Sequence, residues 1–440
     1  MDQVLNQSPP PRSGPRPFPA ALRILLLSQA FQGGGAERAA RELFVHLSQR
    51  GHAVTMLVAR DAPDDPAGVV ASHNRLERWC TPLRKLLPAC NLFHSGSNRC
   101  LAAITQTNVD VVHIHAISQG WLSIPAVADL CRRVPSVWTM HDEWALTLGL
   151  ECDMRDLMTP SEVYALRFGI ERLIPWSRYH DNFRFRRKYT YLRKYLPQPQ
   201  VVTCDSWHLM RRMIAAQRFP TASVRNVTLG LPFMDLPETC MPREEARQRL
   251  NLPSGTPLAL LIAGDLRAPH KGLALALRAL AQIPAVRRPA LVLVGGKAHK
   301  AARATGDMRF FVRCCKSDAD LATLYRAVDV LLLPSVVDQF PYVGMESLAC
   351  STPLVGFRIG GPAEIAGQNE RGLLAEPFDV TAYAKQLCTL LENPALRQEL
   401  GAAGRIWVER IGAVPAYLNA METAYHDARA SFALSPSGVR

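Results

Sequence analysis

The 440-residue chain has no apolar run near the roughly 20 residues that a helix needs to cross a bilayer, so no membrane span is predicted. Its start also lacks the order of a signal peptide, because an acid comes early and a proline-rich stretch precedes the first apolar run. We expect residues 1–21 to form a disordered, proline-rich leader. Two domains are expected at this length, because single cores stop growing at about 250–300 residues.

The cysteines lack the paired spacing of a zinc site or a disulfide framework. There are 11 of them, an odd number scattered along the chain. Cys314 and Cys315 are adjacent, which suits neither an ordinary disulfide nor a cluster of metal ligands. The pattern favours a reducing, cytoplasmic environment.

Acidic residues are the scarcer charge, with 38 acids against 51 lysines and arginines and a formal net charge of +13. The densest basic stretch, residues 182–196, alternates arginine and lysine with phenylalanine and tyrosine. Two interpretations stay open: a solvated helix face, or an interfacial segment resting on anionic lipid. The second predicts a peripheral contact with the cytoplasmic face of the inner membrane. Nucleic acid is not expected, since no recognisable binding module appears elsewhere.

Short apolar runs with polar residues at their ends recur in two series, each alternating with helical patterns. Such runs are typical of parallel strands buried between helices. The pattern predicts an α/β protein of two doubly wound, Rossmann-like domains facing a central cleft, with ligands at the carboxyl ends of the strands. We place the domains at 22–235 and 245–412, with a hinge near 232–256. A helix at 413–432 is expected to return to the first domain.

A glycine cluster, GGGAER, follows the first predicted strand. Gly34 and Gly35 would open a helix, where backbone N–H groups can cradle phosphate oxygens. The dinucleotide fingerprint does not match, because it needs glycine where Arg38 stands and a tighter turn. Two alternatives stay open: glycines that serve only the turn, and a nicotinamide site with Asp61 on the ribose.

Two predicted strands of the first domain end in histidine. His115 follows one of them and lies nearer the cleft than His113, and His141 with Asp142 follows the other. A lone histidine at such a place is more often a structural residue than part of a functional site. Two histidines at the ends of separate strands make a structural role and a functional site about equally expected. No third ligand stands at metal spacing, so no metal is inferred.

A basic loop occupies the matching corner of the second domain. Lys271 and Gly272 begin a helix after a strand, with Arg267 and His270 close by. A cation here, added to the helix dipole, would neutralise the diphosphate of a departing nucleotide. Taken alone, a solvent-facing lysine is the simpler interpretation.

Two acids, Asp338 and Glu346, stand eight positions apart at the mouth of an apolar strand–helix–strand unit. Asp338 lies in the loop, where it would hold sugar hydroxyls. Glu346 falls in the first turns of a helix that begins near Tyr342 or Val343. The helix dipole would keep Glu346 ionised, able to accept two hydrogen bonds from a ribose diol. Alone it would be a dipole partner; the pair favours a site.

With these residues the chain resembles the retaining GT-B glycosyltransferases of family 4. The two acids match that family's acid–x7–acid signature, with Asp338 in place of the usual first glutamate. Similar stretches occur in the expected order over about residues 22–428: GGGAERAARELFVHLSQRGHAV, DVVHIHA, PSVWTMHDEWALT, HKG and GGPAE. The segment WTMHDEWALT looks most like a bacterial exopolysaccharide and colanic-acid subgroup.

The resemblance implies transfer of a sugar from a nucleotide-diphosphate sugar to a hydroxyl, with retention of configuration and without metal or other cofactor. The implied acceptor is a lipid-linked or other glycan precursor of an exopolysaccharide. The resemblance also implies the roles of individual residues: Gly34 and Gly35 near the donor diphosphate, His115 beside the transferred sugar, Lys271 on phosphate, Asp338 on sugar hydroxyls, Glu346 on the ribose, Gly361 and Glu364 at the border of the donor pocket, and His141 and Asp142 on the acceptor or sugar side.

Three positions depart from the family pattern. Asp265 stands where an arginine is usual, and would repel phosphate unless Arg267 substitutes. Asp338 is one methylene shorter than glutamate, and the residue before Gly230 is not the usual asparagine. Alternatives from other classes stay open: an epimerase or phosphorylase of the same fold, and a non-catalytic protein that binds membrane or nucleic acid.

Overall fold

The computed structural model describes residues 21–59, 67–71, 95–118, 121–147, 190–306 and 308–435. The predicted leader therefore lies outside the described residues, apart from Ala21, and so does the basic segment from 182 to 189. Residues 190–195 are helical, and Arg193 and Lys194 are exposed there. None of the helices among the described residues is long and apolar enough to span a bilayer.

The first domain is built on a seven-stranded sheet in the order β3-β2-β1-β4-β5-β6-β7, and every described pairing in it is parallel. Its strands are β1 (Arg23–Leu27), β2 (Ala53–Val58), β3 (Val69–Ala71), β4 (Val111–Ile114), β5 (Ser136–Met140), β6 (Val201–Cys204) and β7 (Ser223–Asn226). The helices of this domain are α1 (Gly35–Gln49), α4 (Ser95–Thr105), α5 (Ile124–Arg133), α6 (Trp144–Thr147) and α9 (Trp207–Ala216).

The second domain is built on a six-stranded sheet in the order β10-β9-β8-β11-β12-β13, again parallel. Its strands are β8 (Leu258–Asp265), β9 (Ala290–Gly296), β10 (Phe310–Arg313), β11 (Val330–Leu333), β12 (Leu354–Phe357) and β13 (Gly372–Ala375). Its helices are α10 (Arg243–Arg249), α11 (Leu273–Ala281), α12 (Ala298–Ala302), α13 (Asp318–Ala327), α14 (Tyr342–Ala349), α15 (Gly360–Ala366), α16 (Val380–Glu392) and α17 (Pro394–Ile411), and 3-10 turns lie at Pro232–Asp235, Pro237–Cys240, Pro269–Lys271 and Ala285–Arg287.

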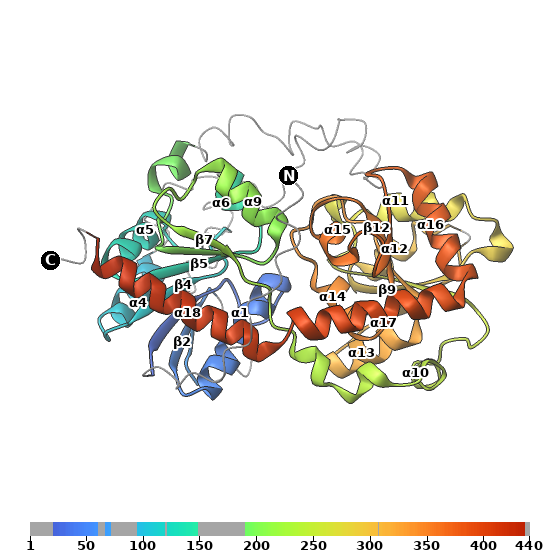
Figure 1. Cartoon of the computed structure of the whole chain (residues 1–440), viewed down its shortest axis with the longest axis horizontal. Coiled ribbons are helices and arrows are strands. Elements are labelled where there is room, and N and C mark those ends of the chain that lie inside the picture. Colours follow the sequence, from blue (N-terminus) through green and yellow to red (C-terminus); the bar gives the residue numbers. More distant parts are fainter. Residues whose placement is uncertain are drawn as a thin grey trace.

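The strands form where the sequence places continuous apolar runs, because helices cover both faces of each sheet. The central strands β4 and β11 are wholly buried, β1 is buried after its first residue, and β8 is buried over its first four residues. Helix α1 turns Ala39, Ala40, Leu43, Phe44 and Leu47 to the core. Two doubly wound parallel sheets side by side confirm the predicted fold class (Figure 1).

The chain passes between the two domains twice, and the two passages lie together. The backbone N–H of Leu231 donates to the carbonyl of Gly412 at 2.9 Å. After the second passage, α18 (Val414–Ala433) packs against β4, β5 and β6 of the first domain (Figure 1). There the buried Glu422 accepts hydrogen bonds from Arg50 and His52 of the first domain.

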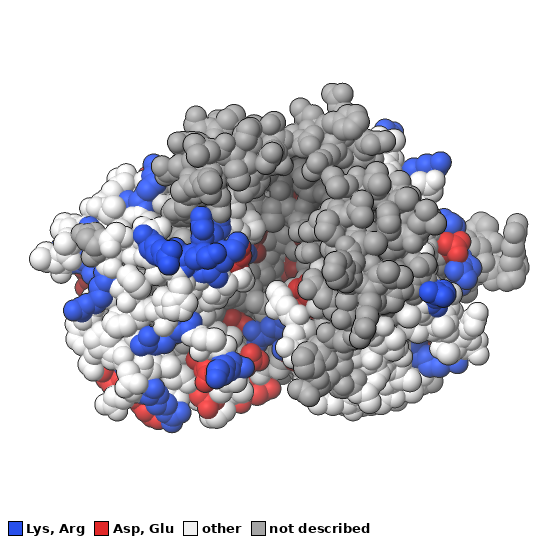
Figure 2. All heavy atoms as spheres, turned by 180° about the vertical axis from the view of Figure 1, so that it is seen from behind, with Lys and Arg blue, Asp and Glu red and all other residues white. Residues whose placement is uncertain are grey.

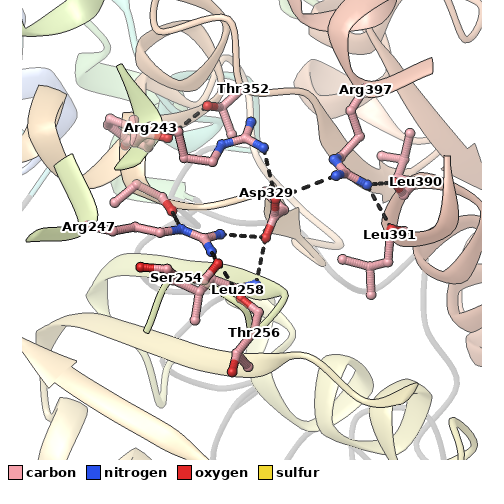
Figure 3. Close-up of polar contacts among 12 residues, drawn as sticks. Arg243, Arg247, Ser254, Thr256, Leu258, Asp329, Thr352, Leu390, Leu391 and Arg397 are labelled. Carbon is pink, nitrogen blue, oxygen red and sulfur yellow. Dashed lines mark hydrogen bonds and ion pairs between the residues drawn. The ribbon is translucent and has the colours of Figure 1, made fainter. Parts of the chain in front are cut away.

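Asp329, directly before β11, links the linker side of the second domain to its sheet. Figure 3 shows Arg243, Arg247 and Arg397 converging on its carboxylate, at 2.9, 2.8 and 3.7 Å. The guanidinium of Arg247 also donates to backbone carbonyls of the segment that enters β8. A buried charge destabilises the folded state unless it is paired and hydrogen-bonded, as Asp329 is. We therefore assign this cluster a structural role.

Candidate functional site

Both sheets reverse their strand order at equivalent places, between β1 and β4 and between β8 and β11. In open parallel sheets, ligands bind at the carboxyl edge where the order reverses. Most of the site residues predicted from the sequence follow one of these four strands. They are Gly34 and Gly35 after β1, His115 after β4, Lys271 after β8, and Asp338 with Glu346 after β11.

The glycine corner begins α1 and is open to solvent. Gly34 is the N-cap and Gly35 the first helical residue, and both are exposed. A Cβ on Gly34 would lie 3.3 Å from a carboxylate oxygen of Glu37, and one on Gly33 would lie 3.0 Å from the same side chain. An incoming anion would therefore meet the Glu37 carboxylate beside the helix N-terminus, so that side chain must turn away for phosphate to bind.

The glycine corner faces α14, the helix of the second domain that carries Glu346. A Cβ on Gly35 would lie 3.4 Å from the ring of Tyr342, the first residue of α14. Arg38, one turn into α1, forms ion pairs with Glu346 of α14 and, at 2.9 Å, with Asp318 of α13. Its guanidinium also lies 5.6 Å from the centre of the Tyr342 ring. The two predicted halves of the site thus meet across the domain boundary.

Glu346 is buried, with 2% of its side chain exposed, so its environment differs from the open helix N-terminus that the sequence suggested. Its oxygens accept hydrogen bonds from Arg38 and, at 2.8 Å, from the Tyr325 hydroxyl. Burial raises the pKa of the carboxyl, while the Arg38 charge and the Tyr325 hydrogen bond oppose that rise. The groups that favour the ionised form are therefore the Arg38 cation of the first domain and the Tyr325 hydroxyl.

Lys271 and Asp338 form an ion pair where the strand order of the second sheet reverses, between β8 and β11. The ammonium of Lys271 lies 2.6 Å from Oδ2 of Asp338, with side chains 29% and 13% exposed. Gly272 has a φ of +68°, and a Cβ there would come within 1.9 Å of the Pro334 carbonyl. Only glycine allows the lysine loop to press against the end of β11, which brings the two predicted groups together.

The departure at Asp265 is compensated within the same domain. Its carboxylate is paired with Lys297, which follows β9, and accepts the backbone N–H of Arg267 at 2.9 Å. These contacts lower the pKa of Asp265 against the effect of burial, so the group is an ionised acid with a cation beside it. The expected repulsion of phosphate is therefore weaker than the sequence suggested, and Lys297 is a cation that sequence reasoning missed.

The GGPAE stretch forms α15 and holds the cleft loops together. The Gly361 N–H donates to the backbone carbonyl of Asp338 at 2.9 Å. Glu364 reaches the first domain, where its oxygens accept the N–H groups of Trp207 and His208 at 3.1 and 3.2 Å. The carboxylate thereby caps the first turn of α9, a placement that favours an anion.

A row of three side chains lies at the carboxyl edge of the first sheet. His115 Nδ1 is 3.0 Å from His141 Nε2, and His141 Nδ1 is 3.4 Å from Asp205 Oδ2. Burial lowers the pKa of His115 well below its usual value, so its ring is neutral at physiological pH. Asp142, predicted beside His141, accepts the N–H of Trp144 and begins the short helix α6. We call His115, His141 and Asp205 the relay.

His113 has a structural role beneath the relay. Its ring nitrogens lie 2.7 Å from the Thr139 hydroxyl and 2.9 Å from the Tyr425 hydroxyl of α18. Burial lowers its pKa to about 3, so it is neutral. Its ring packs 4.1 Å from that of His115, centre to centre.

The two domains leave a hollow between them. Figure 2 shows acidic side chains on the walls of this hollow and lysine and arginine side chains gathered beside it on the second domain. Burial raises the pKa of Asp205 in the first domain, and the hydrogen bond from His141 opposes that rise. The charge of Asp338 in the second domain adds to the rise, so the two edges influence each other across the boundary.

Sequence reasoning missed Arg38, Asp205 and Lys297. Asp205 directly follows the apolar run of β6, so the rule that selected His115 would have found it. Lys297 directly follows β9, so the same rule would have found it as well. Arg38 carried no such signal, because it lies within α1 and its partners are distant in sequence. Arg38 is separated from Glu346 by 308 positions.

Two family descriptions match the chain, one for each domain. Residues 33–230 match "Glycosyltransferase Family 4", and residues 242–407 match "Glycosyl transferases group 1". Two curated relatives are D-inositol 3-phosphate glycosyltransferases of Thermobifida fusca and Streptomyces bingchenggensis, 32% and 33% identical over 200 and 187 residues. The matches cover 42% and 39% of this chain and 46% and 40% of the relatives, so the chain spans less than half the length of either.

Solved structures share the fold over nearly the whole chain. Sucrose-phosphate synthase from Thermosynechococcus elongatus superposes with a TM-score of 0.71 at 20% identity, covering 93% of this chain and 100% of that one. Anabaena HepE in complex with UDP and glucose gives a TM-score of 0.63 at 17% identity, with 92% and 99% covered. WaaG, a glycosyltransferase involved in lipopolysaccharide biosynthesis, gives 0.62 at 18% identity, with 92% and 99% covered.

Proposed function

We propose that this chain, which belongs to the GT-B glycosyltransferases of the family 4 type, transfers a sugar from a nucleotide-diphosphate sugar to a hydroxyl group. One observation carries the proposal. The Lys271–Asp338 pair and the glycine corner each lie where the strand order of their sheet reverses. Helices α1 and α14, from different domains, are joined by the ion pair of Arg38 with Glu346. Cations for a diphosphate and acids for sugar hydroxyls thus border one cleft.

The donor binds mainly to the second domain. Lys271, with Arg267 and the cation at Lys297, neutralises the diphosphate, and electrostatic stabilisation of that leaving group is the main catalytic contribution. Asp338 accepts hydrogen bonds from hydroxyls of the sugar. HepE, bound to UDP and glucose in its structure, supports a nucleotide sugar as the donor class. We further propose retention of configuration and independence from metal.

Glu346 binds the ribose only after the domains move. Its side chain is 2% exposed, and its carboxylate accepts hydrogen bonds from Arg38 and Tyr325 in the described state. A ribose diol must displace the Arg38 guanidinium or enter while the domains are apart. Opening at the paired passages near Leu231 and Gly412 would release Arg38, and closure around the donor would then exclude water.

The acceptor supplies a hydroxyl group, and two classes of acceptor are candidates. We favour a lipid-linked or polysaccharide-precursor glycan in exopolysaccharide synthesis, with a peripheral contact with the membrane at its cytoplasmic face. The curated relatives are named for D-inositol 3-phosphate, which makes a phosphorylated cyclitol the second candidate.

A thermal-shift screen tests the donor. UDP, GDP, ADP and their sugars are added separately, and one nucleotide series is expected to raise the melting temperature, with Lys271→Met removing most of that shift. Absence of any shift would refute the proposal. Product analysis with and without a glycan acceptor separates transfer from epimerisation, which needs no acceptor, and titration with NAD tests the nicotinamide alternative. Supplying D-inositol 3-phosphate against a lipid-linked glycan decides the acceptor.

A further inference from the structure

The relay consists of three side chains from three neighbouring strands. Asp205 follows β6, His141 follows β5 and His115 follows β4, and these strands are adjacent in the sheet. Each residue is the first after its strand, so their side chains meet at the carboxyl edge. Donor binding as proposed above uses none of the bonds within this row.

The geometry fits two imidazoles joined nitrogen to nitrogen. The ring planes of His115 and His141 differ by 16° and the ring centres are 5.2 Å apart, with the two nitrogens at 3.0 Å. Face-to-face stacking would bring the centres much closer together than this. The rings therefore lie edge to edge in nearly one plane, as a linear N–H···N hydrogen bond requires.

The carboxylate fixes the direction of the row. An ionised Asp205 can only accept, so His141 donates from Nδ1. A neutral His141 then has its lone pair on Nε2 and accepts from Nδ1–H of His115. His115 is left with an unprotonated Nε2, which is buried and has no hydrogen-bond partner among the described residues. The two nitrogens of a ring diverge, so this lone pair points away from His141.

We propose that Asp205 and His141 are positioning residues that hold His115 in the Nδ1–H tautomer, so that its Nε2 accepts a hydrogen bond from a sugar hydroxyl in the cleft. The identity of that ligand as a sugar rests on the proposed function. A buried nitrogen without a partner carries a desolvation cost, which a hydroxyl donor removes. The site therefore selects for a hydroxyl at the contacted position over a deoxy sugar. The hydroxyl belongs either to the transferred sugar or to the acceptor.

Nuclear magnetic resonance of protein labelled with ¹⁵N-histidine tests the tautomer without any ligand. Two-bond correlations distinguish protonated from bare ring nitrogens, and the His115 signals are those missing from His115→Gln. The wild type is expected to show a bare Nε2, and Asp205→Asn to shift His115 toward the Nε2–H form, because an amide can donate to His141. Asp110→Asn, at the opposite edge of the sheet, serves as the control and should change nothing. A protonated Nε2 in the wild type, or an unchanged His115 in Asp205→Asn, overturns the proposal.

Kinetics test the role, using the nucleotide sugar that stabilises the protein most in the thermal-shift screen. Asp205→Asn is expected to lower kcat roughly 10- to 100-fold, the value of one well-oriented hydrogen bond, and to leave the Kd for the free nucleotide within about twofold. Loss of both donor hydrolysis and transfer assigns the hydroxyl to the donor sugar; loss of transfer alone assigns it to the acceptor. Wild-type values for both reactions refute the role.

His141→Gln provides a second variant if Asp205→Asn fails to fold. It removes the ring between Asp205 and His115, so the same change of tautomer and the same loss of kcat are expected. Failure of the donor screen would contradict the proposed function while leaving the tautomer result intact. A contrary tautomer would refute the relay while leaving donor binding intact.

Discussion

Replacing Arg38 with alanine tests the contact that joins the two halves of the site. The guanidinium, 15% exposed, lies between Glu346, 2% exposed, and Asp318, 38% exposed. Removing one partner of a buried pair costs about 3–5 kcal/mol, because the other charge stays desolvated. The ion pair with Asp318 is partly exposed to solvent, so its loss adds only about 0–1 kcal/mol. The hydrogen bond from Tyr325 and protonation of Glu346 reduce the loss, so we expect about 3 kcal/mol.

Because the pair spans two domains, part of the response is expected to appear as domain opening, which hydrates Glu346. Urea unfolding at pH 7, followed by tryptophan fluorescence, measures the loss of stability, and small-angle scattering measures the radius of gyration. The double variant Arg38→Ala with Glu346→Gln should recover at least about 1 kcal/mol relative to the sum of the single variants, because a neutral amide needs no cation. Arg23→Ala breaks the exposed pair with Asp110 and should leave the unfolding curve close to that of the wild type, because solvent screens this pair.

The pH dependence of the Arg38→Ala variant has a definite sign. Burial raises the pKa of Glu346 above 4.5, and loss of Arg38 raises it further. The folded state then holds a proton that the unfolded chain has released, so stability falls as pH rises from about 4.5 through the raised pKa. The variant should be least impaired in acid. Unchanged unfolding together with an unchanged radius of gyration, or a cost independent of pH, would refute this account of the pair.

Three further perturbations test other parts of the site. Gly361→Ala would place a Cβ 2.4 Å from a backbone oxygen of the Asp338 loop. The free energy of unfolding measured in urea should therefore fall by more than about 2 kcal/mol, and donor binding should weaken with it. Gly255→Ala is the control and should match the wild type, because a Cβ there would meet no atom within 4 Å. Lys271→Met should weaken nucleoside diphosphate binding about 10- to 100-fold in calorimetry, the value of one hydrogen bond between charged groups, and equal affinity would exclude Lys271 from phosphate binding. Burial lowers the pKa of His113 to about 3, so the folded state binds fewer protons than the unfolded chain between pH 6.5 and 3, and the free energy of unfolding falls with acidification. His113→Asn should reduce the slope of unfolding free energy against pH in this range by up to about 1.4 kcal/mol per pH unit. An unchanged slope would contradict the assignment.

The sequence by itself determined the fold class and the edge on which the site lies. Continuous apolar runs predict parallel strands buried on both faces, and a polar residue directly after such a run must lie at the carboxyl edge. This reasoning found His115 and the loop of Asp338. It also located the helix that carries Glu346, which begins at Tyr342 as expected.

Only the tertiary structure decided which charges meet. Arg38 with Glu346, and Glu364 with the first turn of α9, are contacts between domains, and no local pattern signals a partner more than 150 positions away. Lys297, which compensates the charge of Asp265, comes from a different strand end of the same sheet. Periodicity reports which face and which edge a residue occupies, because these depend on neighbours in the chain. The pairing of charges depends on how the two sheets are set against each other, which is determined by packing summed over both domains.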